Sequence, residues 1–353
     1  PDLARPGPSL SEAQENASAQ LREKVAAAEF SVTLLDGVTG SGKTEVYFEA
    51  VAAALSAKRQ VLVLSPEIAL TPQWLSRFEE RFGVAPAVWH SDLSQVQRRT
   101  NWRAVATGNA RIVVGARSAL FLPFAELGLV VIDEEHEPAF KQEDGVSYHG
   151  RDMAIVRAQI ADAPVVLASA TPSLETRVNV TRERFTSIVL PKRFGGAAMP
   201  TIKTVDMRTT DLSSNRFISD EMVTALKATL EAGEQSMLFL NRRGYAPLTL
   251  CRTCGHRVEC PSCAAWLTEH RFRKRLQCHH CGYEVPTPSV CPSCENVDTL
   301  VACGPGVERI AEEVTGLLPD ARIGIMTSDT MRGPESAQFF IRSVENGELD
   351  ILI

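Results

Sequence analysis

The stretch FSVTLLDGVTGSGKTEVYFEAVAAAL, residues 30–55, decides the fold. It begins with an apolar run typical of a buried strand and ends in a run of good helix formers. Between them lies the spacing Gly37-x4-Gly42-Lys43-Thr44. A glycine-rich turn between a strand and a helix is the P-loop arrangement, in which backbone N–H groups at the helix N-terminus cradle phosphates. The stretch therefore predicts a nucleotide-binding α/β domain.

The side chains of this loop predict the ligand more closely. Lys43 is expected to neutralise the terminal phosphates of ATP, and the Thr44 hydroxyl to reach Mg²⁺. The loop residues predicted to contact the nucleotide are Gly37, Thr39, Gly40, Ser41, Gly42, Lys43 and Thr44. ATP and Mg²⁺ are thus the expected cofactors of this domain.

A second acidic motif, LGLVVIDEEHE, spans residues 127–137. Its apolar half predicts a buried parallel strand that ends at Asp133 and Glu134. Acidic residues after a strand are by themselves also typical of a helix N-terminus, which the helix dipole favours. With a P-loop upstream, we expect Asp133 to hold Mg²⁺ through water and Glu134 to polarise the attacking water. The two motifs together predict an NTPase.

Eight of the nine cysteines lie within residues 251–294. They form four C-x-x-C pairs: Cys251 and Cys254, Cys260 and Cys263, Cys278 and Cys281, Cys291 and Cys294. Two such pairs complete one tetrahedral zinc site, so four pairs predict two Zn²⁺ ions with no open position for water. Disulfides are disfavoured by this spacing and an iron–sulfur cluster by the missing ferredoxin spacings. The spacing alone leaves open which pair joins which.

Composition limits the class of protein. The chain has 353 residues, 44% of them hydrophobic and 23% charged, enough for two domains and a small third. A net charge of −6 does not indicate nucleic-acid binding, so any DNA contact would be local. One basic run, Arg271 to Arg275, fits either a phosphate contact or a solvated hairpin face. The sequence shows neither a signal peptide nor a membrane span, and few thiols lie outside the cluster, which favours a cytoplasmic location without membrane contact.

The order of motifs predicts the domain organisation. Strands are expected near 30–36, 60–65, 110–115, 128–132 and 164–169. The predicted units are a first lobe at 1–192, a linker at 193–205, a second lobe at 206–250 and 295–353, and a cysteine module at 251–294 inserted into the second lobe. The first residue is Pro and the last residues are LDILI, so we expect a fragment of a longer protein.

Several motifs occur in the order typical of superfamily 2 helicases. After the P-loop and DEEH comes ASATPS, and the accompanying segments are LSEAQ (10–14), LSPEIALTPQ (64–73), GARSALF (115–121) and FLNRRGYAPLTLCRTCG (239–255). The last segment leads directly into the first cysteine pair. Across residues 8–353 the chain resembles the bacterial primosomal protein N′ (PriA) family of replication-restart DNA helicases.

The resemblance implies two RecA-like P-loop lobes, the second incomplete, with an inserted two-zinc module. It implies a 3′→5′ ATP-dependent DNA helicase that recognises stalled or branched forks and initiates primosome assembly. DNA, primosome proteins and single-strand-binding protein would be its partners, and we expect a monomer. It also implies one zinc on the first and last cysteine pairs and the other on the two middle pairs.

The resemblance also implies roles for single residues. Gln14 would read adenine, while His136 and Thr171 would report the nucleotide state. Phe140, Tyr148 and His149 would stack on DNA bases, in a loop that couples DNA binding to ATP hydrolysis. Arg117, in GARSALF, would also contact DNA.

Two features set limits on these expectations. Val146 and Ser147 replace the Trp and basic residue common in the family's loop, which weakens the predicted stacking platform. The family's motifs V and VI, which hold the arginine finger, would follow residue 353, so the chain is expected to hydrolyse ATP poorly. The rival hypotheses are a catalytically inactive zinc-ribbon scaffold that recruits primosome partners, which an intact P-loop argues against, and another type of superfamily 2 translocase.

Overall fold

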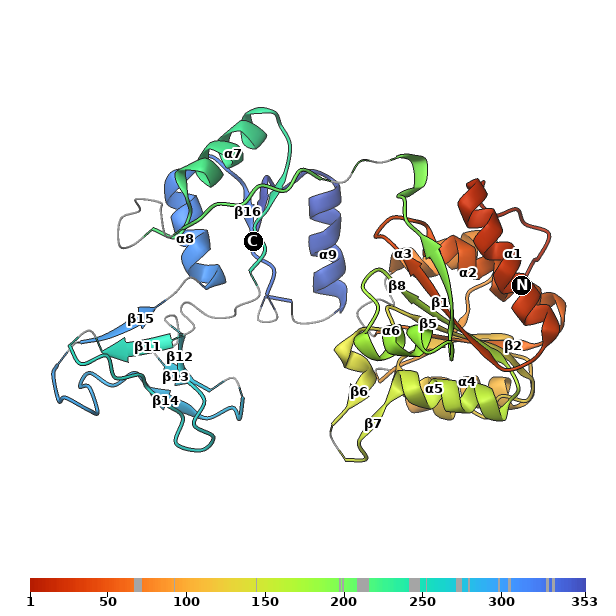
Figure 1. Ribbon diagram of the computed structural model, residues 1–353. Helices are drawn as coiled ribbons and strands as arrows, with labels where there is room; N and C mark the ends of the chain where they lie inside the picture. Colours follow the sequence, from red (N-terminus) through yellow and green to blue (C-terminus); the bar gives the residue numbers. More distant parts are fainter. Residues whose placement is uncertain are drawn as a thin grey trace. The chain divides into compact units, whose positions relative to one another are not determined.

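The computed structural model describes most of the chain (Figure 1). It covers residues 1–353 except 67–71, 92, 144, 197, 199, 208–215, 241–247, 252, 271–274, 279, 298, 304–305, 328–329 and 332–333. Parts of three predicted segments, LSPEIALTPQ, NRRG and the basic run, therefore lie outside the described residues. The chain divides into two compact units, Pro1–Pro200 and Thr201–Ile353.

A seven-stranded sheet in the order β3-β4-β2-β5-β8-β1-β9 forms the first unit, with every neighbouring pair parallel. The strands are β1 (Ser31–Gly37), β2 (Gln60–Leu64), β3 (Ala87–Trp89), β4 (Ile112–Gly115), β5 (Leu127–Asp133), β8 (Pro164–Ser169) and β9 (Thr186–Leu190). The five predicted strands and the α/β class are confirmed. The strands β3 and β9 were not predicted, because β3 is short and β9 alternates exposed with buried residues instead of forming a long apolar run.

Helices cover both faces of this sheet and bury two separate apolar clusters. They are α1 (Glu12–Ala27), α2 (Lys43–Ser56), α3 (Pro72–Phe82), α4 (Gln95–Ala106), α5 (Gly150–Ile160) and α6 (Leu174–Thr181). On one face, the side chains of α1, α2 and α3 pack around Phe48 and Phe78. On the other, α5 and the short 3-10 helix η2 (Arg117–Phe121) pack around Phe140.

The strand order places the predicted motifs together. Since β5, β8 and β1 are adjacent and parallel, the segments that follow them meet at one edge of the sheet. These segments are DEEH, SATPS and the P-loop. Ligands in open α/β sheets bind at this carboxyl edge.

The second unit has a smaller parallel sheet in the order β10-β17-β16. Its strands are β10 (Ser236–Met237), β16 (Ile323–Gly324) and β17 (Ile351–Leu352), and its helices are α7 (Asp220–Glu231), α8 (Val307–Leu317) and α9 (Pro334–Glu345). Val223, Ile310 and Ile351 belong to its apolar core. The second unit is thus also built from a parallel sheet and helices.

The cysteine-rich segment forms antiparallel structure within this second unit. Strands β11 (Leu248–Cys251) and β15 (Leu300–Cys303) pair at its two ends. Between them lies a meander of β12 (Thr268–His270), β13 (Arg275–Gln277) and β14 (Glu284–Pro286). Its core is small and contains Val258, Leu267 and Leu276 beside Cys260 and Cys278.

In the part of the chain that the structure describes, no helix has the length and apolar character needed to cross a membrane.

Candidate nucleotide site and metal centres

The P-loop backbone requires its glycines. Gly40 and Gly42 adopt φ of +80° and +79°, in the left-handed region that glycine tolerates best. A Cβ added to Gly37 would lie 2.5 Å from Ser41 Oγ, and one added to Gly42 would lie 2.3 Å from Gln14 Nε2. Gly42 is also the N-cap of α2, so the loop delivers its backbone N–H groups at a helix N-terminus.

The loop opens on a cavity of about 460 Å³. Thr39, Gly40, Gly42, Lys43, Thr44, Asp133 and Glu134 line it, together with Gln14, Arg77 and Phe194. Lys43 Nζ donates a 2.9 Å hydrogen bond to the Gly37 carbonyl, which holds the ammonium over the loop. Both predicted halves of the NTPase site therefore face one cavity, which has the size of a small-molecule site.

Gln14 connects the first helix to the loop. It is 3% exposed, its Nε2 donates to the Ser41 carbonyl at 2.8 Å, and its Oε1 accepts from the Ser11 N–H at 2.8 Å. An amide has a second N–H and a second lone pair, so one donor and one acceptor remain for a base. Its predicted adenine-reading role stays a prediction, and the structure adds a bracing role.

Asp133 is held by a tyrosine that sequence reasoning missed. The Tyr47 hydroxyl donates to Asp133 Oδ2 at 2.9 Å and accepts from Trp74 Nε1 at 2.8 Å. It also interacts with the Thr44 side chain, so it lies between the two predicted Mg²⁺ contacts. Burial raises the pKa of Asp133 to about 6 and keeps the pKa of Tyr47 well above its usual value. Helical spacing was the available signal, since Tyr47 follows Thr44 by one turn.

Glu134 and His136 follow β5 in a strained turn. Glu134 has φ of +49°, a conformation that costs a non-glycine residue about 1–2 kcal/mol. Its carboxylate lies 3.6 Å from His136 Nδ1, and the same nitrogen is 2.8 Å from Ser169 Oγ at the end of β8. Ser169 in turn accepts a 3.0 Å bond from the Thr171 N–H. The structure therefore connects His136 to the SATPS segment through Ser169, which was not predicted.

Glu135 is a second residue that sequence reasoning missed. Its side chain is fully buried and accepts from Arg151 Nη1 at 3.1 Å, with Arg151 only 6% exposed. It also accepts from the Ser173 N–H at 2.7 Å and the Thr176 hydroxyl at 2.9 Å. Arg151 lies in the first turn of α5, directly after the predicted DNA-contacting loop. A buried ion pair thus joins that loop to the DEEH segment.

The predicted DNA contacts separate into three half-buried residues, Arg117, Tyr148 and His149, and one fully buried residue, Phe140. Tyr148, on the hairpin β6 (Lys141–Gln142) and β7 (Tyr148–His149), meets the exposed ring of Phe121 edge-on at 5.6 Å. Arg117 donates to the Lys141 carbonyl, so η2 and the hairpin form one surface. Burial lowers the pKa of His149 in this hairpin.

The predicted role of Phe140 in stacking on DNA bases is wrong. Its ring is 1% exposed and packs within the apolar cluster beneath η2, so it cannot stack on a base in this structure. It anchors the loop instead. Its ring packs in the cluster that includes Val130 and Ile132 of β5, and the loop sequence carries no signal of this burial. Phe121 was not singled out from the sequence, because an isolated aromatic gives no sign of exposure.

The eight cysteines form two groups of four. Cys251, Cys254, Cys291 and Cys294 make one group, and Cys260, Cys263, Cys278 and Cys281 make the other, with the sulfur atoms of each group within 4.8 Å of one another. This is the nested pairing expected from the family resemblance. All eight are free thiols, and the closest separations are 3.4–3.8 Å. Zn–S bonds of about 2.3 Å in a tetrahedron place sulfurs about 3.8 Å apart, so each group fits one Zn²⁺.

The four cysteine pairs share one turn geometry. In each, the residue after the second cysteine donates its N–H to the carbonyl of the first, at 2.9–3.0 Å. That residue has positive φ in all four turns: Gly255 (73°), Ala264 (57°), Gly282 (76°) and Glu295 (58°). The Ser262 and Ser293 N–H groups also donate to cysteine sulfurs at 3.4 Å. Such bonds stabilise thiolates. The backbone N–H of Cys281 helps lower the pKa of Cys278 to about 6. The hydrogen bond with Thr299 helps lower the pKa of Cys251 to about 5.

Comparison with known proteins shows a helicase domain and a zinc-ribbon domain. A DEAD/DEAH box helicase family model matches residues 11–180, and a model of the PriA DNA helicase Cys-rich region domain matches residues 260–286. The chain is 45% identical to the replication restart protein PriA of Rickettsia felis over 98% of this chain and 53% of the relative. It is 41% identical to that of Bacillus subtilis over 98% of this chain and 43% of the relative. It therefore spans about half the length of these relatives.

A solved structure agrees in fold. The DUF1998 helicase MrfA bound to DNA matches 99% of this chain and 45% of its own, with a TM-score of 0.53 and 15% identity. The helicase-like α/β fold, the two four-cysteine groups of a zinc module and the identities over nearly the whole chain lead to one conclusion: the chain belongs to the family of PriA replication restart proteins.

Proposed function

We propose that this chain is the nucleotide-hydrolysing and zinc-bearing part of an ATP-dependent DNA helicase. The helicase moves 3′→5′, recognises stalled or branched forks and initiates primosome assembly for replication restart. The observation that supports this best is the convergence of Lys43, Thr44, Asp133 and Glu134 on one open cavity. A scaffold that only recruits partners has no use for this arrangement.

The cavity holds the nucleotide through the chain's own groups. The backbone N–H groups of the P-loop face the phosphates, and Lys43 exchanges its bond with the Gly37 carbonyl for the terminal phosphates. Thr44 and Asp133 are the residues that would hold Mg²⁺, which neutralises phosphate charge when bound. Asp133 suits this role because its charge is disfavoured by burial and a cation would restore it.

Hydrolysis also requires an oriented water. Glu134 accepts a hydrogen bond from the water and aims its oxygen at the terminal phosphorus. The new oxygen–phosphorus bond forms as the bond to the bridging oxygen breaks, which leaves ADP and phosphate. The Nδ1 atom of His136 lies beside both the Glu134 carboxylate and the Ser169 hydroxyl, so that His136 reports the presence of the phosphate to the SATPS segment.

DNA acts on this chemistry through the hairpin. Tyr148, Phe121 and Arg117 offer two aromatic rings and a cation on one surface, which suits stacking on unpaired bases. A shift of the hairpin on binding DNA reaches DEEH through the buried pair of Arg151 and Glu135. Because breaking a buried ion pair is strongly unfavourable, the two segments move together.

The zinc module is structural in this proposal. A bound Zn²⁺ would take all four sulfurs of each group, which would leave no open position for water. We propose that the module contacts DNA or primosome partners, including single-strand-binding protein, and that the motor works as a monomer in the cytoplasm.

The test uses full-length protein, a forked DNA and the Glu134→Gln variant. We expect DNA-stimulated ATP hydrolysis and unwinding to fall about 100-fold or more, because the water loses its orienting carboxylate. Glu137→Gln, three residues away, is the matched control and should keep the wild-type rate. Fork restart that survives Glu134→Gln unchanged would favour the scaffold instead.

A further inference from the structure

A second cavity adjoins the cavity of about 460 Å³ that the P-loop lines. It has a volume of about 690 Å³, and Gln14 and Phe194 line both cavities. The catalytic residues Lys43, Asp133 and Glu134 line only the smaller one. A ligand with its phosphates on the P-loop therefore has the larger cavity available for its remaining part.

The walls of the larger cavity suit a flat, partly apolar group. Val38, Leu190, Pro191 and Phe194 provide apolar surface, while Ser11 and Gln14 provide polar groups at its edge. Phe194 is 51% exposed, and its ring has room to cover a ligand. A purine base has this mixed character, since its faces are apolar and its edges carry donors and acceptors. Aromatic rings bind such faces by stacking.

The wall that carries Phe194 is attached directly to the P-loop. The Phe194 N–H donates to the Gly40 carbonyl at 2.9 Å, and the Val38 N–H donates to the Leu190 carbonyl at 3.2 Å. Arg193 packs on the loop, with its Cγ 3.7 Å from where a Cβ on Gly40 would lie. The segment after β9 thus follows any movement of the loop on binding phosphates.

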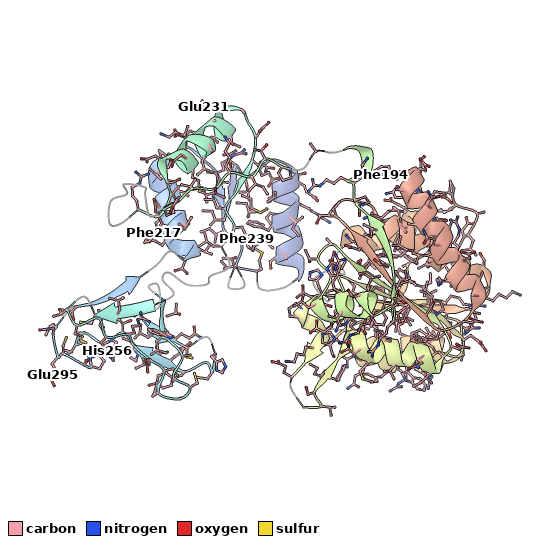
Figure 2. All side chains as sticks on the ribbon, in the orientation of Figure 1. Phe194, Phe217, Glu231, Phe239, His256 and Glu295 are labelled. Carbon is pink, nitrogen blue, oxygen red and sulfur yellow. The ribbon has the colours of Figure 1, made fainter. Side chains whose placement is uncertain are left out.

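At the end of this wall, directly after Phe194, the backbone has room to bend. Gly195 and Gly196 adopt φ of +71° and +72°, and no atom lies within 4 Å of the place where a Cβ would stand on either. Pro200, at the end of the first unit, follows within a few residues. Figure 2 labels Phe194 where the chain leaves the first unit. One side of Phe194 is hydrogen-bonded to the P-loop and the other is a glycine hinge.

We propose that Pro191–Gly196 forms the base-binding wall of the nucleotide site, with Phe194 in contact with the base. The nucleotide thereby fixes the first residues of the segment that connects the two units. This inference rests on the proposed nucleotide site and adds to it the element that recognises the base. It also provides a direct physical connection from nucleotide occupancy to the connecting segment.

The test compares ADP with inorganic tripolyphosphate by calorimetric titration of the 353-residue chain. Phe194→Ala should weaken ADP binding about tenfold or more and leave tripolyphosphate binding unchanged, because only the base contact is lost. Phe194→Tyr should restore ADP binding. Phe239→Ala is the matched control, since Phe239 is an exposed phenylalanine of the second unit.

The other possible results contradict either the base-binding wall or the nucleotide site itself. Unchanged ADP binding by Phe194→Ala, or equal losses for both ligands, contradicts the base-binding wall. Wild-type protein that binds tripolyphosphate as tightly as ADP also contradicts it, while the phosphate site stands. Wild-type protein that binds neither ligand contradicts the proposed nucleotide site itself.

Trypsin gives a second readout that does not depend on affinity. Lys192 and Arg193 are adjacent cleavage sites within the proposed wall. We expect saturating ADP to slow cleavage there, relative to cleavage elsewhere in the chain, and Phe194→Ala to remove this protection. Equally fast cleavage at these sites with and without ADP would contradict the proposal that the nucleotide fixes the first residues of the segment that connects the two units.

Discussion

The nucleotide site and the cysteine module both depend on tight turns that follow strands, yet different forces hold them. The P-loop lies at the edge of a seven-stranded sheet with a buried apolar cluster on each face. The module has a small core, and two of the core residues, Cys260 and Cys278, belong to one of the four-cysteine groups that are predicted to bind zinc. The first site is therefore formed before its ligand binds, whereas the second needs its ligand to fold.

The largest expected effect follows from removing metal. Cys278→Ser removes a buried ligand of the inner group, and structural zinc contributes about 10–16 kcal/mol to folding in small zinc domains. We expect hydrogen exchange across β12, β13 and β14 to lose its protection, while β1 and β5 keep theirs. Cys303→Ser changes the one cysteine that is not part of a C-x-x-C pair and is the control. Equal protection in the two variants would show that the module folds without zinc.

The second prediction concerns a substitution in the nucleotide site that should leave the cysteine module unchanged. Lys43→Ala should weaken ADP binding at least about tenfold, because a charged hydrogen bond to phosphate is lost. Zinc content should be unaffected, since Lys43 lies in the other unit. Lys227→Ala, an exposed residue of α7, serves as control. A loss of zinc in Lys43→Ala would contradict the independence of the two regions.

A smaller effect tests how well the nucleotide site is formed in advance. Tyr47→Phe leaves Trp74 and Asp133 without their shared partner, which should lower the free energy of unfolding by about 1–3 kcal/mol. It should also raise the Mg²⁺ concentration needed for tight ATP binding, while Mg²⁺-free ADP binding stays constant. Thermal unfolding and a Mg²⁺ titration measure these effects.

Trp74→Phe is the matched variant, because it keeps the bond from Tyr47 to Asp133. It should change the Mg²⁺ requirement less than Tyr47→Phe does. If both variants change it equally, Tyr47 does not position Asp133 and only packs in the core.

The smallest effect compares turns within the module. Gly255 and Ala264 occupy the same place in two cysteine pairs, both with positive φ. Gly255→Ala should destabilise the module by about 1 kcal/mol, and Ala264→Gly should stabilise it by a similar amount. Chemical unfolding of the zinc-loaded protein measures both. Changes of the same sign would mean that packing, not backbone strain, decides these positions.

The sequence predicted those features that depend on local chemistry. The P-loop, DEEH and the C-x-x-C pairs each place their functional groups within a few residues, so spacing alone reveals them. The parallel strands followed from long apolar runs. The nested cysteine grouping came from family resemblance, because four equivalent pairs can combine in several ways.

Features that depend on distant contacts could not be read from spacing. Tyr47 reaches Asp133 and Trp74 only after α2, α3 and the sheet have packed. Glu135 looks like one more acidic residue of a polar run, yet it is fully buried against Arg151. Phe140 was predicted to be accessible because it lies in a loop sequence, yet its side chain belongs to the core.

Native mass spectrometry of the 353-residue chain with ADP and Mg²⁺ tests the central claim most directly, because one spectrum counts both ligands. The account predicts two zinc ions and one ADP on the wild-type chain, and two zinc ions with no ADP on Lys43→Ala. A chain that holds ADP equally well with Lys43→Ala, or that folds with fewer than two zinc ions, would contradict it.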